Sequence, residues 1–177
     1  MEIKINNLIK RYGSKTAVDI PDFTLQEGEI LGLVGNNGAG KTTLFRLMLD
    51  LLQADSGTVC MNGTDVARSE EWKTFTGAFM DESFLIDYLT PYEYFQFNGR
   101  MCGLDRNTVN ERIRRYERFL GPEILEEKKF IRNLSAGNKQ KIGIVNALLQ
   151  NPQIVILDEP FNFLDPTSQS LLKHMLQ

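Results

Sequence analysis

A glycine-rich run is the part of this sequence whose residue types and spacing most directly predict chemistry. The phosphate-loop pattern G-x-x-x-x-G-K-[ST] is matched by Gly35-Asn36-Asn37-Gly38-Ala39-Gly40-Lys41-Thr42. Glycines let successive backbone N–H groups turn toward an anion, and a following helix N-terminus adds a favourable partial charge. Lys41 would reach the β- and γ-phosphates, and the Thr42 hydroxyl would hold Mg²⁺. The run therefore predicts a site for a nucleoside triphosphate.

A strand and a helix would position this loop. The apolar segment 29–34 predicts a short strand, and segment 43–49 predicts a helix. A strand–loop–helix order is the setting that favours a phosphate site over a glycine-rich turn before a buried helix.

Two acidic residues follow another apolar segment. Residues 154–157 are apolar enough for a central strand of a parallel sheet, and Asp158, Glu159 and Pro160 come next. Ligands collect at the carboxyl ends of such strands, where buried acids need a cation or hydrogen bonds. We expect Asp158 to hold Mg²⁺ through water and Glu159 to orient and deprotonate the attacking water. Exposed acids at a strand end are the alternative, and the phosphate loop upstream favours the catalytic interpretation.

Composition and charge narrow the class of protein. The 177 residues suit one domain, and 42% hydrophobic with 24% charged residues is typical of globular proteins. A net charge of −3 argues against a nucleic-acid partner, and the basic run 112–115 predicts a solvated helix face. Cys60 and Cys102 lack metal-ligand spacing, which favours free thiols in a reducing compartment. With neither a secretory signal nor a membrane-spanning run in the sequence, we expect a cytoplasmic protein, and any action on a membrane would require a partner.

The remaining segments predict an α/β fold. The first 30 residues alternate as strands do, and segments 58–61 and 74–80 predict two more strands. Segment 82–133 shows helical spacing of apolar residues, and Ser135 is expected to cap a further helix. We therefore predict a P-loop NTPase core with a parallel-rich sheet, an N-terminal antiparallel layer and a helical subdomain.

The segment that contains Ser135 carries a resemblance to a known family. It reads Leu134-Ser135-Ala136-Gly137-Asn138-Lys139-Gln140-Lys141 and resembles the LSGGQ signature of the ATP-binding cassette (ABC) ATPases, here as LSAGN. A serine cap with glycine in the first turn also exposes N–H groups to a phosphate. The resemblance runs from about residue 2 to the end. It implies a head-to-tail homodimer or heterodimer in which the signature reaches ATP held by the other protomer.

The same resemblance implies a set of site residues. Those expected to bind ATP are Tyr12, Gly35, Asn36, Asn37, Gly38, Ala39, Gly40, Lys41, Thr42 and Thr43, with Ser135, Gly137 and Asn138 from the signature. Tyr12 would stack on adenine, with an ordinary strand aromatic as the alternative. Lys41 and Glu159 would be catalytic, and the Mg²⁺ ligands would be Thr42, Asp81 and Asp158. Leu164-Asp165-Pro166 resembles the D-loop that touches the partner's site.

The sequence departs from the family at three points. Asp81 stands where the family has a glutamine, and it is one methylene shorter and charged, so we expect altered metal affinity. Phe163 stands where a small residue is more usual. The family's switch histidine follows a further strand, whereas His174 lies in a helical run before the end at Gln177. The chain therefore resembles a truncated domain, for which we expect Mg·ATP binding with slow hydrolysis.

The resemblance predicts the ATP-hydrolysing subunit of an ABC transporter, bound to a transmembrane permease at the cytoplasmic face of a membrane. Segments 89–95 and 100–104 resemble the subgroup paired with exporter-type permeases. The expected domain has its core at 1–81 and 134–177 and its helical subdomain at 82–133. One alternative is a soluble ABC-type ATPase of translation or cofactor assembly. Another is a regulatory module that holds ATP without hydrolysis, against which Glu159 argues.

Overall fold

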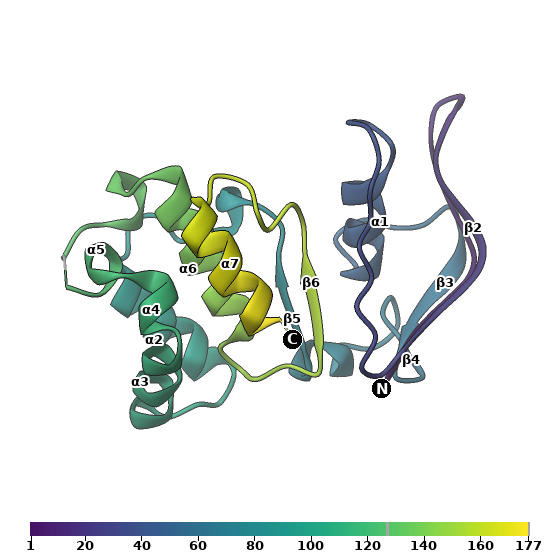
Figure 1. Ribbon diagram of the computed structural model, residues 1–177. Coiled ribbons are helices and arrows are strands. Elements are labelled where there is room, and N and C mark those ends of the chain that lie inside the picture. Colours follow the sequence, from purple (N-terminus) through teal and green to yellow (C-terminus); the bar gives the residue numbers. More distant parts are fainter. Residues whose placement is uncertain (127, 177) are drawn as a thin grey trace. The chain divides into compact units, whose positions relative to one another are not determined.

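The computed structural model describes residues 1–126 and 128–176 (Figure 1). The chain forms two compact units, Met1–Thr76 and Gly77–Gln177, and each is described by itself. Within the described residues, no helix is both long enough and apolar enough to cross a membrane.

The N-terminal unit is built on a four-stranded antiparallel sheet with the strand order β2-β1-β3-β4. Its strands are β1 (Glu2–Tyr12), β2 (Lys15–Gln26), β3 (Ser56–Met61) and β4 (Thr64–Asp65). The alternating apolar residues of β1 form one buried face, where Ile3 and Ile5 lie opposite Leu25 and Phe23 of β2. The predicted antiparallel layer is therefore confirmed.

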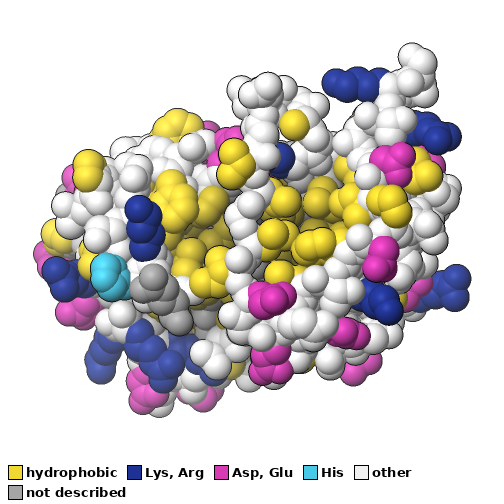
Figure 2. Space-filling model, turned by 45° about the vertical axis from the view of Figure 1, so that its right-hand side comes forward, with side chains coloured by type: hydrophobic (Ala, Val, Ile, Leu, Met, Phe, Trp, Pro, Cys, Tyr) yellow, Lys and Arg dark blue, Asp and Glu magenta, His cyan; other side chains and the backbone are white. Residues whose placement is uncertain are grey.

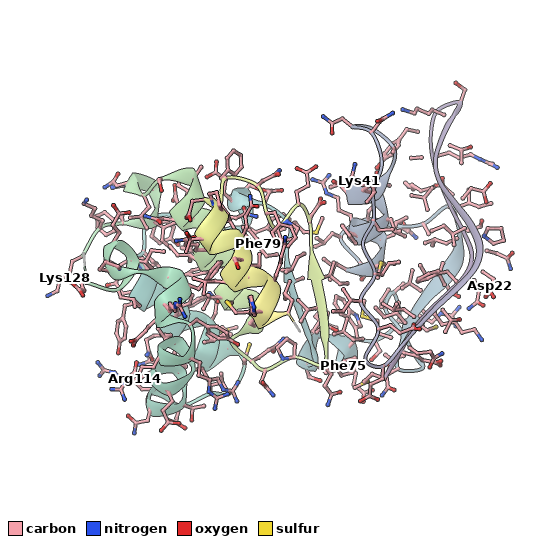
Figure 3. All side chains as sticks on the ribbon, in the orientation of Figure 1. Asp22, Lys41, Phe75, Phe79, Arg114 and Lys128 are labelled. Atoms are coloured by element: carbon pink, nitrogen blue, oxygen red, sulfur yellow. The ribbon has the colours of Figure 1, made fainter. Side chains whose placement is uncertain are left out.

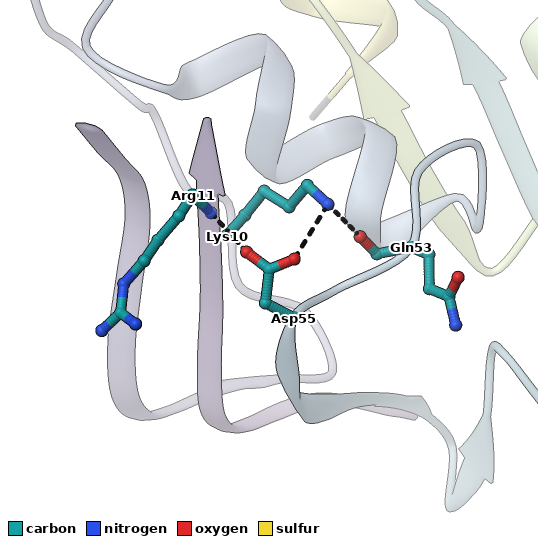
Figure 4. Close-up of polar contacts among 4 residues, drawn as sticks. All are labelled: Lys10, Arg11, Gln53 and Asp55. Carbon is teal, nitrogen blue, oxygen red and sulfur yellow. Dashed lines mark hydrogen bonds and ion pairs between the residues drawn. The ribbon is translucent and has the colours of Figure 1, made fainter. Parts of the chain in front are cut away.

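A tight turn and a polar cluster fix the edges of this sheet. Asn62 and Gly63 join β3 to β4 with φ of 50° and 78°, the two positive values that a type I′ turn requires. Asp55 ties the end of β1 to the segment that enters β3 (Figure 4). Its carboxylate accepts hydrogen bonds from the Arg11 N–H at 2.6 Å and from Lys10 Nζ at 3.2 Å. These two bonds, the backbone one first, hold the pKa of Asp55 below its usual value.

The predicted strand at 29–34 is wrong. Gln26 and Glu29 close a turn instead, since the Glu29 N–H donates to the Gln26 carbonyl at 3.2 Å. The residues that follow join neither edge of the four-stranded sheet, and the side chains of Ile30 and Val34 are 75% and 99% exposed. A strand exists only through hydrogen bonds to a neighbour, so an apolar sequence without a paired neighbour does not suffice.

The C-terminal unit combines two parallel strands with helices. The strands are β5 (Thr76–Phe79) and β6 (Ile154–Leu157), which pair with each other. The longer helices of this unit are α2 (Pro91–Met101), α3 (Arg106–Arg115), α6 (Ala136–Leu148) and α7 (Pro166–Met175). The shorter ones are η2 (Glu82–Phe84), α4 (Glu117–Leu120), α5 (Pro122–Leu125) and η3 (Ile131–Asn133). The predicted helical character of segment 82–133 is confirmed.

The strand predicted at 154–157 forms, but the described sheet does not place it in the centre. β6 has β5 as its one neighbour in that sheet, and its burial alternates. Ile154 and Ile156 are buried, while Val155 is 37% exposed. One covered face, rather than two, is what such alternation indicates. β5 is also shorter than predicted, because Thr74 belongs to the short helix η1 (Glu71–Thr74).

Close packing places α6 directly on β5. A Cβ atom at Gly143 would lie 2.1 Å from Cε2 of the Phe79 ring, so no larger residue fits there without displacing the ring. The buried hydrophobic cluster that contains Phe79 includes Ile142, Ile144 and Val145 of α6. Because α6 begins at the predicted signature, this packing sets where the signature lies within the unit.

Candidate nucleotide-binding site

The predicted phosphate loop lies in the N-terminal unit and leads into α1 (Lys41–Met48). Gly40 is the residue before the helix and has a left-handed backbone, with φ of 92°. A Cβ atom here would lie 2.1 Å from the carbonyl oxygen of Ala17 on β2. Both the backbone angle and the passing strand therefore require glycine at this position. Gly38 is also left-handed, with φ of 81°.

Lys41 begins α1 and folds back over the loop (Figure 3). Its Nζ donates to the carbonyls of Gly35 at 2.6 Å and Asn36 at 3.2 Å. The first turn of α1, which the structure describes in full, contains no acidic residue. The positive charge of the amine and the partial positive charge of the helix N-terminus both favour an anion such as phosphate, and no carboxylate in the first turn of α1 opposes them.

The other predicted residues of this unit lie around the same helix start and on the sheet. Thr42 is exposed in the first turn of α1, and Thr43 is half-buried beside it. The loop residues Asn36, Asn37 and Ala39 are exposed, and the Ala39 N–H closes the loop onto the Asn36 carbonyl at 3.1 Å. Tyr12 ends β1 with its side chain 53% exposed and Lys10 Nζ 5.9 Å from its ring centroid. Its role against adenine stays a prediction.

In the C-terminal unit, the parallel pair β5–β6 brings two predicted metal ligands to one sheet edge. The Asp158 N–H donates to the Phe79 carbonyl at 3.0 Å, so the two strands end side by side. Asp81 follows the end of β5 and Asp158 follows the end of β6, and Asp158 is 6% exposed. This is the edge at which parallel sheets bind ligands.

Asp81 already has a local role in the structure. Its Oδ1 accepts the Ser83 N–H at 2.8 Å and caps η2. The next residue, Glu82, forms an ion pair of 3.0 Å with Lys139 of α6. Within the described residues, no group of three His, Cys, Asp or Glu side chains is arranged to hold a metal ion. A metal here would need ligands beyond these side chains, such as phosphate oxygens or water.

Glu159, the predicted base, is exposed and has a left-handed backbone, with φ of 46°. Its carbonyl accepts hydrogen bonds from Gln140 Nε2 at 3.2 Å and from the Asn162 N–H at 3.1 Å. Its Oε2 accepts Asn162 Nδ2 at 2.5 Å. Sequence reasoning missed both partners, although Gln140 lies within the run that carries the family resemblance.

The signature residues cap α6 as predicted, because Ser135 Oγ accepts the Asn138 N–H at 3.2 Å. A Cβ atom at Gly137 would lie 2.7 Å from the Phe163 carbonyl oxygen, so the signature turn lies against the segment after Glu159. The Asn138 side chain points to α5 and donates to Glu123 Oε2 at 2.6 Å. Its predicted contact with ATP stays a prediction.

The segment after Pro160 contains a second strained residue. Phe163 has φ of 62° and is 73% exposed, an uncommon backbone for a bulky side chain.

Asp165, in the segment predicted to be the D-loop, caps α7 by accepting hydrogen bonds from the Ser168 hydroxyl and N–H. These two bonds hold the pKa of Asp165 below its usual value.

His174 lies on α7 as the sequence indicated. It is exposed, and its Nδ1 lies 2.7 Å from the Ser170 carbonyl oxygen in the preceding turn. On the face drawn in Figure 2, Lys and Arg side chains are interspersed with Asp and Glu, and His174 is the cyan side chain. The basic run 112–115 is only partly a solvated face, because Arg112 donates to the Leu149 carbonyl at 2.7 Å.

The predicted site residues thus divide between the two units. The phosphate loop with Tyr12 lies in one, and Asp81, Asp158, Glu159 and the signature lie in the other. The sequence model of the ABC transporter family matches residues 18–162, which is most of the chain. The chain belongs to the ABC transporter family.

Several curated relatives are similar to this chain over nearly its whole length. The ABC transporter ATP-binding protein NatA of Bacillus subtilis is 34% identical over 91% of this chain and 66% of its own length. The bacitracin transport ATP-binding protein BcrA of Bacillus licheniformis is 33% identical over 98% of this chain and 56% of its own. The lantibiotic transport ATP-binding protein SrtF of Streptococcus pyogenes is 30% identical over 99% of this chain and 73% of its own. The chain therefore spans 56% to 73% of the length of these three relatives.

Proposed function

We propose that this chain is the Mg²⁺-dependent, ATP-binding and ATP-hydrolysing part of an ABC transporter. The observation that carries the proposal is the geometry of the phosphate loop. The left-handed backbone of Gly40 leads directly into α1, so the start of this helix and the Lys41 amine lie beside the same loop, where they could bind an anion. Membership of the ABC transporter family supports it, as do relatives named as ATP-binding proteins.

In this proposal, each residue has a distinct role toward ATP. The start of α1 and Lys41 hold the phosphates. To do so, Lys41 must replace its hydrogen bonds to the carbonyls of Gly35 and Asn36 with hydrogen bonds to phosphate oxygens. Glu159 orients the attacking water and takes its proton. The N–H groups at Ser135 and Gly137 receive the phosphate of the other protomer's ATP, because the first turn of a capped helix leaves such donors unused.

Mg²⁺ fits the donor chemistry of the proposed ligands. Thr42, Asp81 and Asp158 offer hydroxyl and carboxylate oxygens, the hard ligands that Mg²⁺ takes together with water and phosphate. When bound, the ion would neutralise charge on the transferred phosphate. Asp81 Oδ1 already accepts the Ser83 N–H at the start of η2. Binding of Mg²⁺ through this oxygen would therefore compete with that hydrogen bond.

We further propose a head-to-tail dimer that closes on ATP and drives an exporter-type permease from the cytoplasmic face of the membrane. In the proposed domain, 1–81 and 134–177 form the core and 82–133 form the helical subdomain that transmits closure. The resemblance of segments 89–95 and 100–104 to exporter-associated cassettes supports this partner. Relatives named for bacitracin and lantibiotic transport support a transporter role.

The test combines hydrolysis, trapping and fractionation. We expect Mg²⁺-dependent phosphate release, loss of ATP binding in Lys41→Ala, and an ATP-bound dimer that accumulates in Glu159→Gln and is visible by size-exclusion chromatography. A protein that binds ATP equally well with and without Lys41 would overturn the assignment of the phosphate loop. Detergent extraction of native membranes should recover a stoichiometric hydrophobic partner. If the protein is recovered without any such hydrophobic partner, the result would instead favour a soluble ABC-type ATPase.

A further inference from the structure

Glu159 is held in an energetically unfavourable backbone conformation at the end of β6. Its φ of 46° is in the left-handed region, although it has a Cβ atom. A non-glycine residue there is strained and persists only where its surroundings over-determine its conformation. The contacts that hold Glu159 are therefore informative about how the site is built.

These contacts come from two side chains that the proposed chemistry does not use. Gln140 Nε2 donates to the Glu159 carbonyl at 3.2 Å, and Asn162 Nδ2 donates to the Glu159 carboxylate at 2.5 Å. The Asn162 N–H adds a second bond to the same carbonyl at 3.1 Å. On the other side, the Asp158 N–H is fixed to Phe79 at 3.0 Å. Hydrogen bonds thus hold the preceding residue Asp158, the Glu159 carbonyl and the Glu159 carboxylate.

Gln140 is unusual because it is a polar side chain within the apolar face of α6. It is 8% exposed and its neighbours along the helix include the fully buried Ile142 and Ile144. Burying an amide group is unfavourable unless it is hydrogen-bonded, so the contact with Glu159 is what offsets its burial. The direction of the Glu159 carbonyl in turn fixes the peptide plane and hence the direction of its Cα–Cβ bond.

We propose that Gln140 and Asn162 are positioning residues that hold Glu159 for proton abstraction, Gln140 through the backbone carbonyl and Asn162 through the carboxylate. This inference rests on the proposed role of Glu159. It adds that α6, the helix that begins at the signature, directly sets the orientation of the base. Proton transfer by a general base depends on this geometry before it depends on anything else.

The main test replaces Gln140 with methionine, which keeps the length of the side chain and removes the donor. We expect Gln140→Met in the purified protein to lower kcat about tenfold while KM and the Kd for ATP change less than about twofold. Gln96→Met is the matched control. Gln96 is 7% exposed, and its Nε2 donates to Asn110 at 2.8 Å, so the same change removes an equally buried amide away from Glu159. It should leave kcat unchanged.

A second variant covers the case in which Gln140→Met does not fold. Asn162 is exposed, so Asn162→Ala should fold normally, and we expect it to lower kcat with little change in KM. An unchanged kcat in Asn162→Ala, or in a folded Gln140→Met, would overturn the corresponding half of the proposal.

A double variant separates this inference from the proposed function. If Gln140 acts through the base, adding Gln140→Met to Glu159→Gln should not slow single-turnover hydrolysis further. A further tenfold loss in that background would show a general structural effect and overturn the inference. If Glu159→Gln itself hydrolyses ATP normally, the proposed role of Glu159 fails instead. An inactive Glu159→Gln with an unaffected Gln140→Met would leave the proposed function intact and remove only the positioning role.

Discussion

Replacing Gly143 with alanine should destabilise the protein, although helix propensity alone gives the opposite sign. In an exposed helix, this change stabilises by about 1 kcal/mol because glycine loses more backbone entropy on folding. In α6, however, the added Cβ would lie 2.1 Å from Cε2 and 2.3 Å from Cδ2 and Cζ of Phe79. Ordinary contact begins at 3.4 Å, so the ring must move by more than 1 Å.

The size of the effect follows from the burial of that ring. Phe79 is 4% exposed and packs in the hydrophobic cluster of the C-terminal unit, so a displaced ring must push against other buried side chains. Overpacking of this kind costs about 1–3 kcal/mol, and the upper part of that range applies because three ring atoms clash. After subtracting the propensity gain, we expect a net loss of roughly 1–2 kcal/mol, or about 2–8 °C in Tm for a chain of this size.

Urea denaturation followed by circular dichroism would measure this loss as a lower midpoint at constant m-value. The control is Phe79→Leu, which removes part of the ring and should make Gly143→Ala less harmful, so that the double variant is more stable than the sum of the two single changes. A Gly143→Ala protein that is more stable than the wild type would refute the packing argument.

Four further outcomes are expected. Phe163→Gly should raise the free energy of unfolding by roughly 1 kcal/mol, whereas Phe163→Ala, which keeps a Cβ at φ 62°, should not; denaturation curves would compare them. The hydrogen bond from the Arg11 N–H lowers the pKa of Asp55 in the folded protein. The ionised Asp55 therefore stabilises the fold fully at pH values above its unfolded-state pKa, and this stabilisation is lost as the pH falls toward the folded-state pKa; an NMR titration midpoint of Asp55 at or above 3.8 would contradict this. Burial raises the pKa of Tyr94 to about 12, so Tyr94 should still be neutral at pH 11; ultraviolet titration of the protein and of Tyr94→Phe would check this by their difference. Asp81→Gln should change the Mg²⁺ dependence of hydrolysis, and an unchanged dependence and turnover would contradict the expected effect of the shorter, charged side chain on metal affinity.

Several features could be predicted from the sequence because their signals are local. The left-handed turn at Asn62-Gly63, the cap at Ser135 and the glycines of the phosphate loop each depend on the backbone preferences of adjacent residues. The helical segment 82–133 was predictable for the same reason, since caps such as the reciprocal Thr90–Glu93 pair lie within four residues of each other.

Other features required the tertiary structure, because they depend on partners far away in the sequence. Segment 29–34 has the composition of a strand but pairs with no strand of the two described sheets, and apolar segment 154–157 is covered on one face only. Nothing near Gln140 in the sequence indicates that it would bond to Glu159, nineteen residues further along the chain.

The site residues follow the same division. The sequence by itself determined the chemical groups: the lysine and threonine of the phosphate loop, the acids after β6 and the serine-capped helix of the signature. The tertiary structure decided how those groups are held, through the left-handed backbone of Glu159 and the approach of α6 that Gly143 permits. Residue type fixes which bonds a side chain can make, but only the packing of distant elements decides which of those bonds are made.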